Sequence, residues 1–170
     1  NSLGPDRERV RHFNAVLSPY QGPDLYRSVG QLVVSLVGFV GFWYAMLRSL
    51  EVSYFLTLAL AVPTAGFLTR LFMIQHDCGH GSFFKSSRAN DCVGAVIGLL
   101  TLTPYTYWKQ THAIHHSTSG NLDRRGYGDI DTLTVREYAA LTRWGRWKYR
   151  VYRSIPVLFF IGPAFHFVVY

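Results

Sequence analysis

The sequence predicts an all-α membrane protein with several membrane-spanning helices and a cytoplasmic helical cap that carries groups of histidine. Three observations support this prediction. Long stretches of the chain contain no charged residue, a very short turn separates the first two stretches, and five of the seven histidines fall into two tight groups. The first two features are typical of a helical hairpin in a bilayer, and the third indicates that several imidazoles share a target.

The composition excludes two other classes of protein. With 49% apolar and 16% aromatic residues, the chain is too hydrophobic to remain disordered. Its two cysteines, Cys78 and Cys92, are too few for a disulfide-stapled secreted domain. The mean hydropathy of +0.09 is near neutral because it averages apolar stretches with a basic remainder.

Two membrane spans are predicted at about residues 31–50 and 53–74. Apolar side chains cover every face of these segments, and about 20 such residues of helix cross the hydrocarbon core of a bilayer. A signal peptide is a poor alternative, because residues 1–30 are polar or mixed and no small-residue cleavage site follows. The buried core of a soluble helical bundle is a second alternative, since Gly, Ser and Pro63 interrupt the segments.

The distribution of Lys and Arg predicts the orientation of this hairpin. Four arginines precede the first span and eleven basic residues lie between Lys85 and Arg153, whereas Arg48 is alone in the turn between the spans. The positive-inside rule therefore places both flanks in the cytoplasm. Residues 1–30 are predicted to form a cytoplasmic amino-terminal segment.

Two further apolar stretches follow the hairpin. Residues 92–107 are too short and too interrupted to cross a bilayer comfortably, so we predict an interfacial or re-entrant segment. Residues 155–170 resume a spanning pattern that continues to the last residue. Because the chain also begins at Asn1 and not at Met, we expect a fragment of a longer protein.

The two histidine groups carry the most informative chemistry. They are His76 with His80, and His112 with His115 and His116. Residues three or four apart share one face of a helix, so each group points its imidazoles at a common target. Protonated imidazoles would repel one another and buried neutral ones would each need a partner, whereas a metal ion resolves both problems. One ion takes about three or four protein ligands, so five histidines suggest two ions, and a di-iron centre is the natural candidate.

Each feature also has a purely structural interpretation. A lone His-X3-His pair on a helix is more often a capping feature than a metal site, and only the combination of both groups favours metal. Asp77 is either a partner that fixes an imidazole tautomer or a helix-end charge. Cys78 is interpreted as a packing residue. His12 and His166 lie apart from the groups and are not predicted to bind metal.

Two motifs and their flanks resemble those of a known family. They are His76-Asp-Cys-Gly-His80 followed by Gly-Ser-Phe-Phe, and His112-X2-His115-His116 with Ser-Gly-Asn-Leu-Asp-Arg-Arg-Gly behind it. With these flanks the chain resembles the integral-membrane fatty acid desaturases from about Tyr20 to its end. The segment Gly128-Asp-Ile-Asp-Thr-Leu-Thr-Val-Arg-Glu-Tyr138 is similar to one in the bacterial acyl-lipid desaturase branch.

The resemblance implies a reaction and a site. Family members use a histidine-bound di-iron centre, O2 and two electrons to place a double bond in an acyl chain. The five grouped histidines map onto the first two of the family's three histidine boxes, and no catalytic residue is assigned beyond these metal ligands. Asp77, Asn121 and Asp123 are candidates for residues that hold the ligands in place. The third box is missing, so the resemblance implies the amino-terminal half of the enzyme, with residues 31–170 as an incomplete desaturase domain that is inactive alone.

Two other functions remain open at this point. A related membrane di-iron hydroxylase or ketolase, acting on a carotenoid, a sterol or an alkane, has similar histidine boxes. A membrane metal-binding protein without catalysis is the alternative from another class. A zinc hydrolase is a poor candidate, because it needs a three-ligand site and a general base, and this chain has too many histidines.

The net charge of +7 predicts partners on the cytoplasmic side. Anionic lipid headgroups and an acidic electron donor, such as ferredoxin or a cytochrome-type carrier, both suit a basic surface. Nucleic acid suits it poorly, because the basic residues adjoin membrane spans and no binding motif accompanies them. The expected location is a membrane, the inner membrane if the source is bacterial, with the histidines on the cytoplasmic side.

Overall fold

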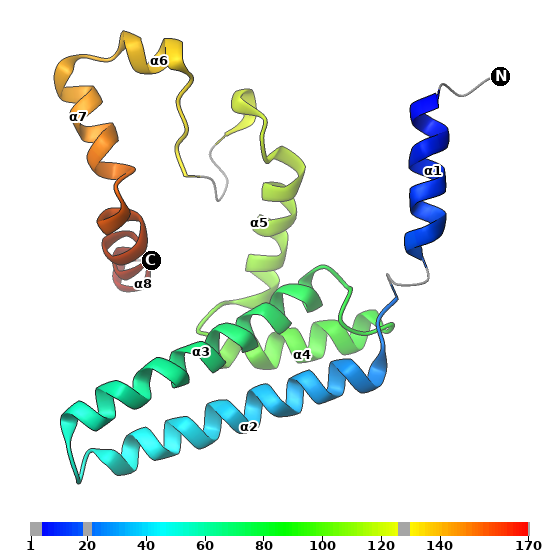
Figure 1. The fold of residues 1–170 in the computed structure, drawn as a ribbon, viewed down its shortest axis with the longest axis vertical. Helices are drawn as coiled ribbons and strands as arrows, with labels where there is room; N and C mark the ends of the chain where they lie inside the picture. The colour runs from blue at the N-terminus through cyan, green and yellow to red at the C-terminus, as the bar shows by residue number, and fades with distance from the viewer. Residues whose placement is uncertain (1–4, 19–21, 126–129, 170) are drawn as a thin grey trace. The chain divides into compact units, whose positions relative to one another are not determined.

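The computed structural model describes residues 5–18, 22–125 and 130–169, and every regular element in these ranges is helical (Figure 1). The prediction of an all-α fold is therefore confirmed. The chain forms two compact units, residues 1–116 and 117–170. The elements in chain order are α1 (Pro5–Leu17), α2 (Leu25–Ser49), α3 (Tyr54–Gly79), α4 (Ser87–Leu100), α5 (Tyr105–Thr118), a 3₁₀ helix (Leu122–Arg124), α6 (Val135–Ala140), α7 (Arg143–Tyr152), a π-helix (Val157–Ile161) and α8 (Gly162–Val169).

Helices α2 and α3 form the antiparallel hairpin that the sequence predicts (Figure 1). Both are long and apolar enough to cross a membrane, with 25 and 26 residues. At about 1.5 Å per residue they exceed the hydrocarbon thickness of about 30 Å. Only 6% and 17% of their most apolar windows are buried within this chain, whereas the core helices of a soluble protein are mostly buried. Their apolar surfaces face outward, as expected for a membrane protein.

The two helices extend further than the apolar runs alone predict. Helix α2 begins at Leu25, because the Asp24 side chain accepts a hydrogen bond from the Arg27 backbone N–H at 2.9 Å and caps the helix. Helix α3 continues to Gly79 and carries the first histidine group on its last turn. The predicted bounds 31–50 and 53–74 follow hydropathy, which does not detect the polar residues that continue each helix.

Gly81 ends α3 directly after the first histidine group. Its φ of +69° is left-handed, a conformation that glycine adopts without steric cost. The Gly81 N–H donates to the Cys78 carbonyl and the Ser82 N–H to the Asp77 carbonyl, both at 3.0 Å. This pattern is a Schellman motif, which makes His80 the C-cap residue of the helix.

Helix α4 runs back along the histidine-bearing half of α3 (Figure 1). Its 14 residues span about 21 Å, too little to cross a bilayer. The chain then reverses in a turn at residues 101–104 and enters α5. Gly94 and Gly98 permit this reversal, since a Cβ at Gly94 would collide with the Tyr105 ring and one at Gly98 would lie 2.6 Å from the Thr103 carbonyl oxygen. The interfacial or re-entrant segment at 92–107 stays a prediction; these residues form the second half of α4, the turn and the start of α5.

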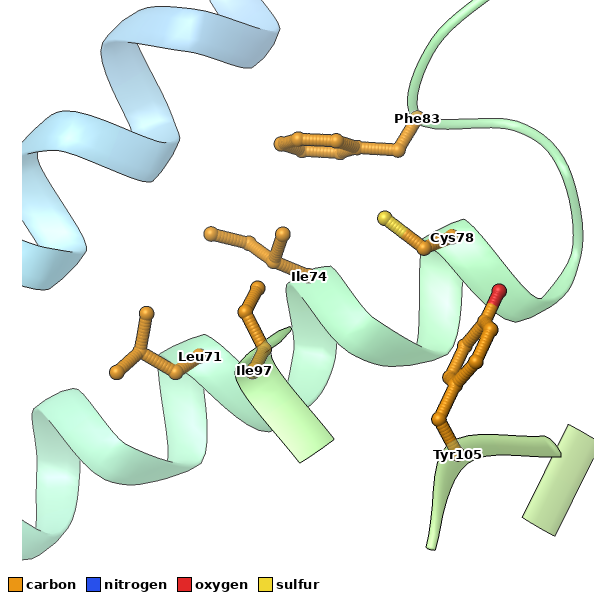
Figure 2. Close-up of a cluster of buried hydrophobic side chains, with 6 residues drawn as sticks. All are labelled: Leu71, Ile74, Cys78, Phe83, Ile97 and Tyr105. Carbon is orange, nitrogen blue, oxygen red and sulfur yellow. The ribbon is translucent and has the colours of Figure 1, made fainter. Parts of the chain in front are cut away.

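A small apolar core joins α3, α4 and the start of α5 (Figure 2). Leu71 and Cys78 are fully buried, and Cys78 is therefore a packing residue, as the sequence indicates. The complete core consists of Leu71, Ile74, Cys78, Phe83, Ile97 and Tyr105. At the far end of the hairpin, the hydroxyls of Ser49 and Thr57 lie 2.8 Å apart and join α2 to α3.

The second unit has a set of polar contacts around α6. Thr134 and Glu137 form a capping box at the start of this helix. Arg125 donates to both carboxylate oxygens of Glu137, at 3.0 and 3.2 Å. The unit ends in the π-helix and α8, whose described residues run from 157 to 169. A membrane span over 155–170 stays a prediction.

Candidate metal centre

The first histidine group lies at the carboxyl end of α3. His76 is in the last turn and His80 is the C-cap residue, so their rings stand on the same face, one turn apart. Their Nε2 atoms are 3.3 Å apart. Both imidazoles therefore direct the same nitrogen to one point.

The second group lies at the carboxyl end of α5. The Nε2 atoms of His112 and His116, four residues apart, are 3.0 Å from each other. The turn at 101–104 brings α5 back to α3, so His112 Nε2 also lies 3.0 Å from His76 Nε2 and 3.2 Å from His80 Nε2. Two histidine pairs that are far apart in the sequence thus meet at one place.

Hydrogen bonds alone cannot account for this arrangement, which we call the four-histidine cluster (His76, His80, His112 and His116). An imidazole Nε2 carries either one hydrogen or one lone pair and makes one hydrogen bond. His112 Nε2 has three nitrogen neighbours in the cluster. A cation satisfies all four lone pairs at once. Nitrogen ligands at about 2.0–2.1 Å from one ion lie about 3.3 Å apart. Four of the Nε2 pairs have spacings of 3.0–3.3 Å, and all the ligand atoms lie within 4.8 Å of one another.

His115, the fifth predicted ligand, lies beside the cluster and not in it. The group of ligand atoms within 4.8 Å of one another contains the other four grouped histidines. The His115 ring is stacked on His112 with 6.0 Å between centroids and is 5.7 Å from the His116 ring. Its position at i+3 from His112 turns the imidazole to one side of the shared point.

The surroundings of His112 and His80 favour the neutral form of their imidazoles. Desolvation, followed by the neighbouring imidazoles, lowers the pKa of His112 from 6.5 to about 4. The pKa of His80 is also lowered, first by desolvation and then by His76 and His116, while Asp77 opposes the shift. Neutral imidazole is the form that binds a metal ion.

The three residues predicted to hold the ligands differ in position. Asp77 Oδ1 lies 3.4 Å from His76 Nδ1, where it can accept the Nδ1–H and leave Nε2 free for the cluster. Asn121 belongs to the second unit, and its side chain accepts from the Asp123 backbone N–H at 3.0 Å to cap the 3₁₀ helix. These contacts give Asp77 a direct link to a cluster histidine and give Asn121 and Asp123 a local structural role.

Trp108 is a residue at the site that the sequence analysis missed. Its indole stacks on the His112 imidazole with 4.5 Å between centroids and an angle of 16°. It also lies 5.7 Å from the rings of His76 and Phe72. A Cβ placed on Gly79 would be 2.7 Å from the indole, so this glycine provides the space for the ring. Trp108 is four residues before His112, a spacing that could have indicated a shared helix face.

A second missed feature is the Asp91 network, formed by Asp91, Tyr105 and Lys109. Asp91 Oδ1 accepts from Lys109 Nζ at 2.7 Å and from the Tyr105 hydroxyl at 3.1 Å, and so links α4 to α5. The lysine hydrogen bond is the main cause of a lowered Asp91 pKa. The signal in the sequence is that Asp91 and Lys109 are the charged residues at the two ends of an uncharged run, which suggests that its ends meet.

The remaining histidines and the second cysteine lie outside this cluster. His12 is exposed on α1, and Cys92 is an exposed free thiol on α4. His166 belongs to α8, and its side chain lies outside the described residues. That His12 and His166 are not ligands stays a prediction.

Comparison with known proteins places this site in a wider context. The model of the family described as "Fatty acid desaturase" matches residues 52–170. A "Fatty acid desaturase" of Bacillus subtilis (strain 168) is 48% identical over 161 residues, which are 95% of this chain and 46% of the relative. An "sn-1 acyl-lipid omega-3 desaturase (ferredoxin)" of Synechocystis sp. is 34% identical over 110 residues, which are 65% of this chain and 30% of the relative.

A third relative has a different reaction in its name. An "Oleoyl-12-hydroxylase" of Ricinus communis is 44% identical over 57 residues, which are 34% of this chain and 15% of the relative. The chain spans less than half the length of each of these three relatives. No solved structure matches the chain.

Proposed function

The chain belongs to the fatty acid desaturase family, and we propose that it supplies the first two histidine groups of an enzyme that inserts a double bond into an acyl chain with O2 and two electrons. The observation that carries this proposal is the convergence of four histidines from α3 and α5, whose ligand atoms all lie within 4.8 Å of one another, with His112 Nε2 3.0–3.2 Å from the Nε2 atoms of the other three. Such a cluster can hold a metal ion, and the two helices that lead to it suit a membrane-dissolved substrate.

The donor set supports iron as the resident metal. Imidazole nitrogen suits iron, copper, nickel and zinc, and the lack of paired thiolates argues against zinc-ribbon or iron–sulfur sites. Four histidines surround one point, and His115 beside them is proposed as a ligand of a second ion. When bound, two iron ions would supply the capacity to activate O2 and accept electrons.

The residues of this chain would prepare such a site in three ways. The pKa shift of His112 keeps its imidazole neutral and available at neutral pH. Asp77 accepts the Nδ1 hydrogen of His76 and orients Nε2 toward the shared point. Trp108 covers one face of His112 and excludes water from it.

The proposed substrate and electron donor follow from the surroundings of the site. Two membrane-crossing helices lead to the cluster, so an acyl lipid in the bilayer is the proposed substrate. The Synechocystis relative carries ferredoxin in its name, and an acidic carrier of this type suits the positive net charge. We place the histidines on the cytoplasmic side, and on the inner membrane if the source is bacterial, because Lys and Arg concentrate on both flanks of the hairpin.

The test uses the full-length protein expressed in membranes with a ferredoxin reducing system. We expect about two irons per protein and conversion of acyl chains to products with one more double bond. The His80→Ala variant should insert normally and lose activity, with His12→Ala as the matched control. Stoichiometric zinc without iron, or full activity of His80→Ala, would overturn the proposal.

A hydroxylase is the second candidate function. The observation that favours it is the similarity to the oleoyl-12-hydroxylase, whose aligned segment is as similar to this chain as those of several desaturases. Mass spectrometry of the lipids separates the two reactions. A desaturated product has two hydrogens fewer than the substrate, whereas a hydroxylated product has one oxygen more.

A further inference from the structure

Helix α7 exposes an apolar stripe that its own unit leaves uncovered. Trp144, Trp147 and Val151 occupy positions i, i+3 and i+7 and therefore share one helix face. Their exposed fractions are 59%, 53% and 40%. The two indoles are stacked, with 4.5 Å between centroids and an angle of 9°. Exposed tryptophans in such an array are expensive in water and indicate an apolar or interfacial surrounding.

Basic residues border this stripe on both sides. At 100° per residue, Arg143 lies along one edge of the stripe and Lys148 along the other. Lys148 Nζ is 5.5 Å from the centroid of the Trp144 ring. The sequence contains no acidic residue from 138 to 170, so nothing nearby in the sequence neutralises these cations.

The opposite face of α7 is used within the protein. Arg146 donates to the backbone carbonyl of Leu141 at 3.1 Å, and Arg150 donates to the Tyr138 hydroxyl at 2.7 Å. The Tyr149 hydroxyl accepts from the Leu133 backbone N–H at 3.1 Å. These bonds fix which face of the helix points away from α6. The apolar stripe and its two flanking cations are on that outward face.

We propose that α7 lies flat on the cytoplasmic membrane surface and binds anionic phospholipid. In this arrangement Trp144 and Trp147 lie at the boundary between headgroups and acyl chains, and Arg143 and Lys148 contact lipid phosphates. A bilayer surface has the same order of polarity, with apolar acyl chains beneath negatively charged headgroups. The apolar stretch 155–170 begins three residues after the helix ends, so the chain continues directly into apolar sequence.

The apolar stripe decides between a lipid surface and an acidic protein as the partner. An acidic electron donor would contact the cations, but its binding would give no reason for an exposed tryptophan stripe between them. A bilayer contacts the cations and the stripe together. This inference does not depend on the identity of the bound metal or on the reaction, so it can fail or succeed independently of the proposed function.

The experiment measures tryptophan quenching in vesicles that contain the reconstituted full-length protein. Phosphatidylcholine brominated near the headgroup or near the chain end serves as the quencher, with or without phosphatidylglycerol. The Trp144→Phe/Trp147→Phe variant provides the background from the other tryptophans. We expect the difference signal to be quenched at least twofold more by the shallow label than by the deep one, and more strongly in the anionic vesicles.

Charge variants then test the role of the flanking cations. Arg143→Gln/Lys148→Gln should abolish the dependence on phosphatidylglycerol, whereas Arg9→Gln/Arg11→Gln, which removes equal charge from α1, should leave it unchanged. Circular dichroism verifies that each variant is folded. Equal quenching by both labels would overturn the proposal. So would an α7 charge variant that keeps its lipid dependence and loses only the rate of reduction by ferredoxin, since this result would assign the face to a protein partner.

Discussion

The indole of Trp108 lies parallel to the imidazole of His112, with 4.5 Å between ring centroids and 16° between planes. Phe72 meets the same indole edge-on at 5.7 Å and 74°. His112 is the member of the four-histidine cluster with the most nitrogen neighbours. The plane of its ring is therefore set by an aromatic stack that reaches from α5 to α3.

Replacement of Trp108 tests this restraint. Trp108→Leu removes the stack and should weaken metal binding about tenfold, the size of effect expected when a group that orients a metal ligand is lost. Trp108→Phe keeps an aromatic face and should retain most of the affinity. Competition with a chelator measures the affinity directly. Equal affinities for the leucine variant and the wild type would show that His112 is oriented by other contacts.

Gly79 provides a second test of the same contact from α3. A methyl group at this position would lie 2.7 Å from the Trp108 ring and would displace it, so Gly79→Ala should lower metal affinity although alanine favours helix. Gly66→Ala is the matched control on the same helix, because a Cβ there meets nothing within 4 Å. Thermal unfolding and metal titration of both variants give the comparison. Identical behaviour of the two would contradict the prediction.

The Asp91 network should affect metal binding more than stability. Asp91 and Lys109 have side chains that are 51% and 38% exposed, and an exposed ion pair contributes at most about 1 kcal/mol to the free energy of unfolding. Asp91→Ala should therefore change the unfolding free energy little. It should nevertheless loosen α5 against α4 and reduce metal affinity. A double-mutant cycle with Lys109→Met, measured as metal affinity, isolates the contribution of the Asp91–Lys109 pair. A coupling energy of zero would show that this pair does not affect metal binding.

The positions of His112 and His115 predict different metal stoichiometries. His112 contacts three cluster nitrogens, whereas His115 stands beside the cluster. His112→Ala should lose nearly all bound metal, and His115→Ala should lose about one of two ions if it serves the second site, as proposed. Elemental analysis of the purified proteins counts the ions. A full complement of metal in His115→Ala would remove that histidine from the ligand set.

The capping box of α6 predicts an acid-sensitive step in the second unit. Hydrogen bonds from the Thr134 backbone and hydroxyl, followed by those from Arg125, lower the pKa of Glu137 from 4.5 to about 2. Because the folded-state pKa is the lower one, this stabilisation is present above pH 4.5 and is lost as the pH falls toward 2. Hydrogen exchange of residues 134–141 should accelerate over that window. Glu137→Gln should remove the pH dependence, and Asp131→Asn serves as the matched control.

Helical spans and histidine spacing were predictable because they depend on local sequence. Uncharged runs predicted the α2–α3 hairpin, and the four-residue spacing predicted that His76 and His80 share a face. The segment 92–107, interpreted as too short to cross a bilayer, covers the end of α4, a turn and the start of α5. Periodicity and charge suffice for such features, since each is decided within one helix.

Contacts between helices were not predictable in the same way. The stack of Trp108 on His112 depends on how the 101–104 turn directs α5, and no local pattern encodes that direction. The separation of His115 from the other four histidines likewise depends on the rotation of α5 about its axis. The role of Asn121 in holding the ligands stays a prediction, and the contact that the structure shows for its side chain is the cap of the 3₁₀ helix.

The position of Arg70 predicts where the four-histidine cluster lies relative to the hydrocarbon layer of the bilayer. It is the first charged residue along α3, and its Nε–H donates to the Ser35 hydroxyl on α2 at 3.4 Å. A guanidinium is costly in hydrocarbon, so under the proposed function we expect the hydrocarbon layer to end near this residue, and His76 follows about 9 Å further along the helix. Under the proposed function, an acyl chain has to rise out of the lipid to reach the metal. Each methylene drawn into water would cost about 0.8 kcal/mol, so the walls of that passage must be protein and apolar.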